Sequence, residues 1–540
     1  MTMPAIDGAD GARSGRSEGE AERKKLLARA GVVGAGTLAS RLLGLARDMA
    51  LAAVFRRDET DAFFVAFTIP NALRQLLGEG AISSAVVPLL SAKIASDGDA
   101  EARRFFAKVR GLSLLALSAA TALGMIFARP LTELFAGGYE GAQLERCVHM
   151  TRIVFPYIFL VGTAALGMAA LHAKRRFAVA AFAPALLNVA FLITAFTLPA
   201  PLAAAGIDRA DAIAYGALLG GVLQVAAQWP ALRAIGFAPF PRLDLADPSV
   251  REVFRRIAPM TFGIGVYYID LVVSRRFLSE LGEGAQSYFT WAMRVCDFPQ
   301  GIFVMALSTA ALPSLSALAA RGERDELAAT FAHGLRLAMF VAVPATVLVA
   351  TLPGPLVAAL FQRGEFDATA VRETALALAW QGSAIWTVAG VRQIVPVFHA
   401  LGDTRTPVIV SAIDLAAFIV LAVVLRGAFG HVAISVAVAG SSFVQAALLL
   451  AALRVRLGAL PSGAIAGSLA RTLAASLAAA AGAAALARAL ASSPRAVPGV
   501  AGAVAFVVLF AGAAAVLRSP ELAEVTAGVR RRLARGRSAR

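Results

Sequence analysis

The sequence has few charged residues and few cysteines for its length. Of its 540 residues only 16% are Asp, Glu, Lys or Arg, whereas a soluble domain carries about 25%. The two cysteines, Cys147 and Cys296, match no zinc, haem or redox spacing and are too few for a disulfide framework. The shortage of charge excludes a soluble domain of this size, and the shortage of cysteine excludes a disulfide scaffold.

Apolar residues take the place of the missing charges. They make up 58% of the chain, the mean hydropathy is +0.71, and the apolar runs exceed the roughly 18–20 residues that cross a bilayer. We therefore expect an all-α polytopic membrane protein with about fourteen transmembrane helices. The expected spans are residues 29–54, 61–92, 105–128, 147–172, 177–198, 211–232, 256–279, 285–317, 328–352, 371–400, 407–426, 431–453, 466–489 and 495–517.

The net charge of +16 is concentrated in the tails and loops, which is typical of membrane anchoring and not of nucleic-acid binding. Lys and Arg are slightly more frequent in loops after even-numbered spans. Basic runs before the first span, at 23–25, and after the last, at 530–532, strengthen that bias. An even number of spans with both termini cytoplasmic satisfies the positive-inside rule.

An internal repeat organises the spans. Residues 83–92 and 308–317 match at an offset of 225 residues, and 171–173 and 398–400 match at nearly the same offset. An offset of six helices keeps both copies in one orientation, which predicts two parallel six-helix lobes around a midplane cavity. The expected organisation is a disordered cytoplasmic tail at 1–27, an N-lobe at 28–235, a C-lobe at 250–457, a last helix pair at 464–518 and a basic cytoplasmic tail at 519–540.

The first span carries charges that lipid does not tolerate. Arg41, Arg47 and Asp48 share a sector of about 120° with Thr37 and other small or polar residues, at 100° per residue. An arginine at mid-membrane costs about 2.5–3.5 kcal/mol, so such residues face a cavity or a partner. Asp48 adjoins Arg47 in sequence and is not expected to neutralise both arginines.

Further charges follow in the second and eighth spans. The second carries an acid near its outer end, an arginine after a proline and an acid between two glycines, and the eighth carries a spaced arginine and acid: Asp61, Arg74, Glu79, Arg294 and Asp297. The planar guanidinium donates two parallel hydrogen bonds to phosphate, so we expect the arginines to bind a diphosphate. The alternative is that they pair with Asp48, Asp61, Glu79 and Asp297 and only lock helices together. A mixture of the two is also open, in which these ion pairs exchange partners and gate the cavity.

Two more intramembrane acids, Asp270 and Asp414, either bind a coupling cation or proton or make a polar contact between helices. A membrane enzyme acting on a lipid-linked sugar needs clustered acids, a metal site or a catalytic His. Asp208 and Asp211, with Arg209 between them, come nearest to that and match it poorly. We therefore expect a transporter without catalytic residues, metal or cofactor, driven by the membrane potential or an ion gradient.

The quoted residues resemble the signature of a known family. Ser40–Asp48, Thr60–Phe67, Pro70–Arg74 and Gly78–Ala81 are similar to the start of the bacterial lipid II flippases (MurJ, formerly MviN), and Phe155–Tyr157, Phe182–Asn188 and Ala400–Pro407 resemble later landmarks. The resemblance covers about residues 28–457. Met293 and Ser274 depart from the family pattern, where an acid or an amide is usual, which bears on ion coupling.

The resemblance implies the multidrug/oligosaccharidyl-lipid/polysaccharide (MOP) exporter fold. It implies lipid II as substrate, carried from the cytoplasmic to the periplasmic leaflet of the bacterial inner membrane, with peptidoglycan synthases as further partners. Arg41, Arg47, Arg74 and Arg294 correspond to the family's cavity arginines and Asp61 to its helix 2 acid. The last helix pair would form a groove for the lipid tail. The remaining alternative is a flippase for another undecaprenyl-linked oligosaccharide.

Overall fold

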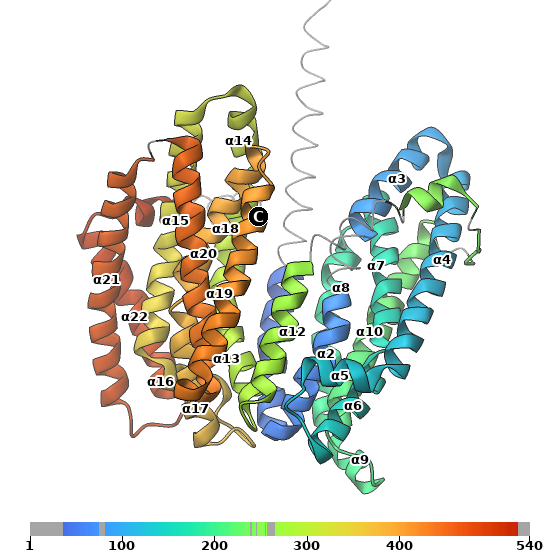
Figure 1. The fold of residues 1–540 in the computed structure, drawn as a ribbon, viewed down its shortest axis with the longest axis horizontal. Helices are drawn as coiled ribbons and strands as arrows, with labels where there is room; N and C mark the ends of the chain where they lie inside the picture. The colour runs from blue at the N-terminus through green and yellow to red at the C-terminus, as the bar shows by residue number, and fades with distance from the viewer. Residues whose placement is uncertain are drawn as a thin grey trace, which may run out of the picture. The chain divides into compact units, whose positions relative to one another are not determined.

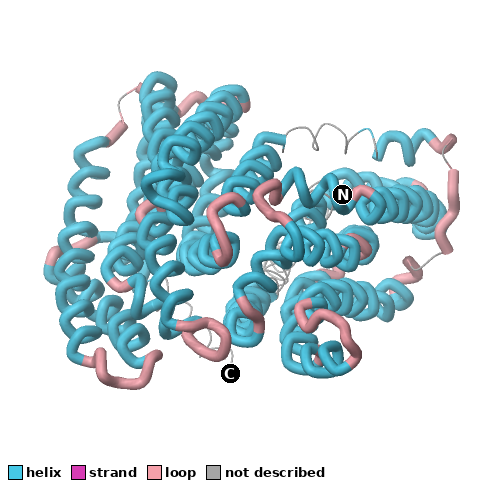
Figure 2. Tube along the Cα trace, turned by 60° about the horizontal axis from the view of Figure 1, so that its bottom comes forward, coloured by secondary structure: helices cyan, strands magenta, loops and turns pink. Residues whose placement is uncertain are grey.

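The structure is a computed structural model that describes residues 36–74, 82–237, 240–244, 246–253, 255, 265–458 and 460–527. Helices joined by short loops make up this part of the chain, and no strand occurs in it (Figure 2). Eight of its helices are long and apolar enough to cross a bilayer by length and composition. The polytopic all-α class is confirmed, and the number of fourteen spans stays a prediction.

The chain divides into two compact units, and each is described by itself. The first comprises residues 1–51, 66–132 and 145–265. The described residues begin with a helix at 36–54. The labelled helices up to the second unit are α2 (Arg57–Arg74), α3 (Ile82–Ser96), α4 (Gly98–Ile126), α5 (Ala128–Phe135), α6 (Gly141–Val154), α7 (Tyr157–Ala173), α8 (Ala178–Thr197), α9 (Pro199–Ala204) and α10 (Asp211–Ala234) (Figure 1).

The second unit comprises residues 52–65, 133–144 and 266–540. Its helices are α12 (Gly265–Ser279), α13 (Ala285–Pro299), α14 (Met305–Arg321), α15 (Arg324–Thr351), α16 (Pro353–Phe361), α17 (Ala368–Gly382), α18 (Ile385–Ala400), α19 (Arg405–Phe429), α20 (Ala433–Leu457), α21 (Ser462–Ala489) and α22 (Val497–Val516). A π-helical stretch, Gln300–Val304, joins α13 to α14 directly after Pro299. The expected span at 285–317 is therefore one continuous helical segment with a local irregularity.

Packing repeats between the two units in the way the sequence repeat predicts. In the first unit α3 and α4 pack on α7, and α10 packs on α7 and α8. In the second unit the helices six spans later pair alike: α14 and α15 pack on α18, and α20 packs on α18 and α19. Two copies of one six-helix arrangement explain this correspondence. The predicted lobe boundaries at 235 and 250 stay a prediction, because grouping by packing moves 52–65 and 133–144 to the second unit.

Small residues set the closest helix contacts in the first unit. Gly216 and Gly220 lie one turn apart on α10, and a Cβ on Gly220 would lie 2.9 Å from the Cα of Leu187 in α8. Such spacing lets two helix backbones approach within a bilayer, where no hydrophobic effect drives helices together. The apolar core beside this contact joins α3, α4 and α7 to the end of α10.

The last helix pair packs on the second unit, and the residues that follow it bind there as well. α21 packs on α22 and α15, and α22 packs on α16. Residues 520–527 form a further helix within the segment expected to be a basic tail. Glu521, 2% exposed, accepts hydrogen bonds from Arg336 of α15, Ser468 of α21 and Ser519. This network ties the end of the last span to two other helices.

Candidate functional site

Arg47 is held in place by an acid and an amide. Its Nε and Nη2 donate to Asp48 Oδ1 at 2.9 and 2.7 Å, and its Nη1 donates to Asn188 Oδ1 at 3.1 Å. Its guanidinium carbon lies 5.5 Å from the centroid of the Phe191 ring. Asn188 Nδ2 in turn donates to the Ser40 carbonyl at 2.9 Å. Helix α8 therefore fixes both the backbone and the charge of the helix at 36–54.

Arg41 lies on the same helix without such partners. It is half-buried, and it makes no hydrogen bond or ion pair with any residue that the structure describes. Asp48 is 3% exposed and lies against Arg47, so the sequence-based expectation that it does not serve both arginines agrees with this geometry. The first unit thus presents one fixed cation and one that is available to an anion.

The two remaining candidate residues of the second span lie at and beyond the end of the described part of α2. The backbone of Arg74 ends α2, while its side chain and the whole of Glu79 lie outside the described residues. Their expected roles in substrate binding and gating stay predictions.

Asp61 caps a helix that begins more than two hundred residues later. Its carboxylate is 1% exposed and accepts the backbone N–H of Gly284 at 2.6 Å and of Ser287 at 2.8 Å, together with the Ser287 hydroxyl at 2.5 Å. Gly284 has φ +87°, a conformation that suits glycine and that starts α13. A carboxylate at a helix N-terminus satisfies unpaired amides and meets the positive end of the helix dipole.

Neighbours of Asp61 bind the same turn. The hydroxyls of Thr60 and Ser287 are 2.7 Å apart, and Arg57 Nη1 donates to the Tyr288 hydroxyl at 3.3 Å. We call Arg57, Thr60, Asp61, Ser287 and Tyr288 the capping cluster. All five lie in the second unit, although three of them come from the second span of the chain.

Aromatic packing extends the capping cluster along the two helices. The rings of Phe64 in α2 and Trp291 in α13 meet edge to face with centroids 4.8 Å apart. Trp291 also packs on Phe361 at the end of α16, with centroids 5.5 Å apart. The α2 segment therefore contacts two helices of the second unit through both polar and apolar side chains.

A second segment of the N-terminal half binds at the same helix ends. Gly138 N–H donates to Ser279 Oγ at 2.9 Å, and Gln143 Nε2 donates to the Asp58 carbonyl at 2.9 Å. The residues 52–65 and 133–144 thus form one polar and aromatic junction with the end of α12 and the start of α13. Breaking that junction requires the simultaneous loss of several buried hydrogen bonds.

Arg294 and Asp297 lie three residues apart in the second half of α13, and both are half-buried. Arg41 and Arg47 belong to the first unit and Arg294 to the second. The predicted convergence of these arginines on one cavity therefore stays a prediction.

Asp270 of α12 and Asp414 of α19 lie close enough for their charges to interact. Both are half-buried, and Asp414 Oδ1 has no hydrogen-bond partner among the described residues. From the sequence, each acid was identified as a separate candidate. The structure brings them together, beside an apolar cluster that joins α12, α13, α19 and α20.

Residue-by-residue reasoning on the sequence missed several of the partners. Asn188 was quoted only as a landmark, although an amide in the apolar α8 is itself a signal of a polar contact. Gly284 and Ser287 gave no signal, because a glycine before a helix and a serine in its first turn are commonplace. Arg275 is 7% exposed and donates to Gln286 Oε1, in the first turn of α13, at 2.8 Å. From the sequence, only its neighbour Ser274 was named, as a departure from the family pattern.

Fold and site together define a membrane transporter with cationic side chains in its N-terminal unit. An inward-facing MATE-family multidrug resistance transporter of the MOP superfamily matches 78% of this chain and 96% of its own, with a TM-score of 0.65 at 16% identity. The structure of a lipid II flippase MurJ in an inward closed conformation matches 90% of this chain and 99% of its own, with a TM-score of 0.72 at 20% identity. At such identities the likeness establishes the MOP exporter fold.

Sequence comparison narrows this class to one family. The sequence model of the lipid II flippase MurJ family matches residues 52–498. The probable lipid II flippase MurJ of Bdellovibrio bacteriovorus is 33% identical over 437 residues, 80% of this chain and 83% of that protein. The lipid II flippase MurJ of Burkholderia cenocepacia is 33% identical over 427 residues, 78% of this chain and 82% of that protein. The chain belongs to the lipid II flippase MurJ family, as its N-terminal residues predict.

Proposed function

We propose that this chain moves lipid II from the cytoplasmic to the periplasmic leaflet of a bacterial inner membrane, by alternating access and with both termini cytoplasmic. Membership of a family of flippases, which are transporters, supports the reaction. The observation that carries the site is the contrast between Arg47, fixed by Asp48 and Asn188, and Arg41, which has no anionic partner among the described residues. A half-buried cation without an anionic protein partner is suited to bind an anionic substrate.

In this mechanism the diphosphate of lipid II binds Arg41 first. The guanidinium is permanently charged and donates paired hydrogen bonds to phosphate oxygens, and the low dielectric around it strengthens the attraction. Arg47 adds a second, pre-oriented charge, because its partners already hold its side chain. Arg74 and Arg294 complete the phosphate site in the proposal, as the family resemblance implies.

The capping cluster acts as a gate in this proposal. Asp61 and its neighbours hold residues 52–65 against the start of α13, and an outward opening has to release them. Each bond is made by a group that water can satisfy once exposed, so the junction can open at moderate cost. Asp297 and Glu79 act as ion-pair partners of the cavity arginines in this proposal.

The membrane potential and a bound cation supply the driving force in this proposal. Two negative charges moving outward from an inside-negative cell gain about 2.3 kcal/mol per charge per 100 mV. Asp270 and Asp414 interact with each other, and a cation between them would relieve their repulsion. The expected partnership with peptidoglycan synthases stays a prediction.

Reconstitution tests the function directly. Purified protein in liposomes with labelled lipid II in the inner leaflet should render the label accessible outside, with the lipid chemically unchanged. Arg41→Ala should abolish the movement, and Arg321→Ala, a change of equal charge at an exposed pair with Glu323, should leave it intact. Chemical conversion of lipid II would instead identify an enzyme, and transport by Arg41→Ala at the wild-type rate would refute the arginine assignment.

Movement of lipid II also has to be compared with that of another undecaprenyl-linked saccharide. Equal rates of transbilayer movement for a lipid-linked oligosaccharide that lacks the pentapeptide would show that the protein recognises the diphosphate and the lipid and not the peptidoglycan headgroup.

A further inference from the structure

A basic and aromatic hollow lies on α4, α7 and α10 of the first unit, on elements other than the helix that carries Arg41 and Arg47. It has two parts that share Val225 and Trp229. The outer part is an open apolar groove of about 340 Å³ between α7 and α10, lined by Leu160, Val222, Val225, Ala226, Trp229 and Pro230. The inner part is a small cavity of about 20 Å³ that reaches Phe106 and Arg110 of α4.

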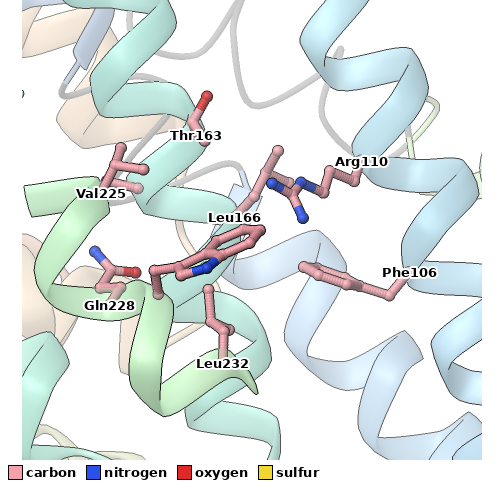
Figure 3. Close-up of a pocket in the computed structure, with 10 residues that line it drawn as sticks. Phe106, Arg110, Thr163, Leu166, Val225, Gln228 and Leu232 are labelled. Carbon is pink, nitrogen blue, oxygen red and sulfur yellow. The ribbon is translucent and has the colours of Figure 1, made fainter. Parts of the chain in front are cut away.

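Two arginines contact Trp229, the residue that lines both parts of the hollow. The guanidinium carbon of Arg110 lies 5.4 Å from the centroid of the Trp229 ring, and that of Arg233 lies 5.8 Å from the same centroid. Both cations therefore interact with one indole. Figure 3 shows the Arg110 side chain extending from α4 over the cavity, with Phe106 one turn away on the same helix.

The cavity floor holds a polar group without protein partners. Gln228 is 1% exposed, and neither its Nε2 nor its Oε1 has a hydrogen-bond partner among the described residues. Both atoms belong to a side chain that lines the cavity below Arg110 (Figure 3). Buried amides are almost always satisfied, so this one indicates a polar ligand group or a water that the ligand retains.

Nearby acids are engaged elsewhere. Lys108 of α4 binds Asp244 and Asp247 at 2.8 Å each, and Lys174 at the end of α7 binds Asp99. Arg233 has no ion pair with a described residue, and it lies exposed at the end of α10. Arg233 therefore presents a positive charge beside the apolar groove.

We propose that α4, α7 and α10 form a binding site for an anionic phospholipid. The phosphate contacts Arg110 and Arg233, the glycerol or headgroup oxygens reach Gln228 directly or through one water, and an acyl chain lies along the groove of α7 and α10. Tryptophan with flanking basic residues is the usual arrangement at the level of lipid headgroups. A soluble anion would leave the groove empty, and a zwitterionic lipid has no net charge to match the two arginines.

The site lies at the end of the unit that is cytoplasmic in the orientation proposed above, so its lipid comes from the inner leaflet. Its existence does not depend on which lipid the protein transports. A bound phospholipid there would fill the space between three helices and hold them together.

Native mass spectrometry of the full-length protein tests the site, with phosphatidylglycerol or phosphatidylcholine of equal chain length as probe. Wild-type protein should retain phosphatidylglycerol in preference to phosphatidylcholine, and Arg110→Gln with Arg233→Gln should lower that retention by about fivefold per arginine. The control is Arg104→Gln with Arg321→Gln, which removes two charges from exposed ion pairs with Glu101 and Glu323. It should retain the lipid as wild type does.

A second variant separates lipid binding from charge and from folding. Val222 is 49% exposed and lines the groove, so Val222→Trp should fill the path of the acyl chain without altering either arginine. It should weaken retention of long-chain phosphatidylglycerol and leave that of a short-chain analogue unchanged. Unchanged retention in both the double-arginine variant and Val222→Trp would overturn the proposal, as would an equal loss in the control.

Discussion

The two parts of the candidate site handle buried charge in opposite ways. In the first unit, Arg47 and Arg41 stand on one helix with a single nearby acid, so positive charge is in excess. In the second, Asp61 is buried with no arginine partner among the described residues, and two backbone amides and a hydroxyl donate to its carboxylate. The first arrangement leaves charge for a ligand. In the second arrangement the charge of Asp61 is used to hold residues 52–65 against the start of α13, as a gate requires.

The largest effect is expected where a buried charge loses its partner. Arg47→Ala removes two charge-assisted hydrogen bonds from the buried carboxylate of Asp48, which should destabilise the protein by about 3 kcal/mol and abolish lipid II movement. Thermal unfolding in detergent and the liposome assay measure the two effects. The matched variant Arg47→Ala with Asp48→Asn should recover most of the stability without the transport, since the uncompensated acid is gone. Recovery of transport would mean that Arg47 acts only by neutralising Asp48.

A moderate effect is expected at the cap. Asp61→Asn keeps one acceptor oxygen but loses the charge at the start of α13, so about 1 kcal/mol of stability should be lost. If the cluster is a gate, crosslinking between cysteines placed at positions 64 and 291, whose rings are in contact in the native protein, should fall in the variant while lipid II binding persists. Ser287→Ala removes only the hydroxyl and should have a smaller effect in the same direction. A variant that loses lipid II binding at unchanged crosslinking would place Asp61 in the substrate site instead.

A pH-dependent effect is expected at Glu521, which sharpens the comparison because this acid does have an arginine. Burial alone would raise the pKa of Glu521, but hydrogen bonds from Ser519, its own backbone amide, Arg336 and Ser468 outweigh burial and hold the pKa at about 2. The unfolded value is about 4.3. A lowered pKa adds stability above that value and loses it as the pH falls toward 2.

The melting temperature should therefore show no contribution from Glu521 titration between pH 8 and pH 5. Glu521→Gln should lower it over that whole range by a constant amount, and the difference from wild type should shrink only below about pH 4. A difference that disappears already near pH 6 would show that the carboxylate is not held by Arg336.

More of the polar arrangement could be predicted from the sequence for the helix at 36–54 than for the capping cluster. Helical spacing alone places Arg41 and Arg47 on one stripe, and adjacency brings Asp48 to Arg47. The partner of Asp61 lies 223 residues away, and no local pattern specifies which helix start it meets. The repeat predicted two lobes of the same arrangement, and the helices of the two units pack in corresponding pairs.

Other contacts could not be predicted from the sequence for related reasons. The segment after the last span reads as a basic tail, yet Glu521 within it is buried by two helices that the sequence does not connect to it. Asp270 and Asp414 are separated by four spans, and only the fold brings them near each other. Long-range polar contacts depend on helix orientation, which hydropathy does not encode.

Binding of lipid II to the wild-type protein and to Arg41→Ala, measured as dissociation constants in the same detergent, tests the central claim most directly. A charge-assisted, bidentate phosphate contact is worth about 1.5–3 kcal/mol, so the variant should bind at least about tenfold more weakly while unfolding at the wild-type temperature. Equal dissociation constants for the two proteins would contradict the assignment of Arg41 to the diphosphate.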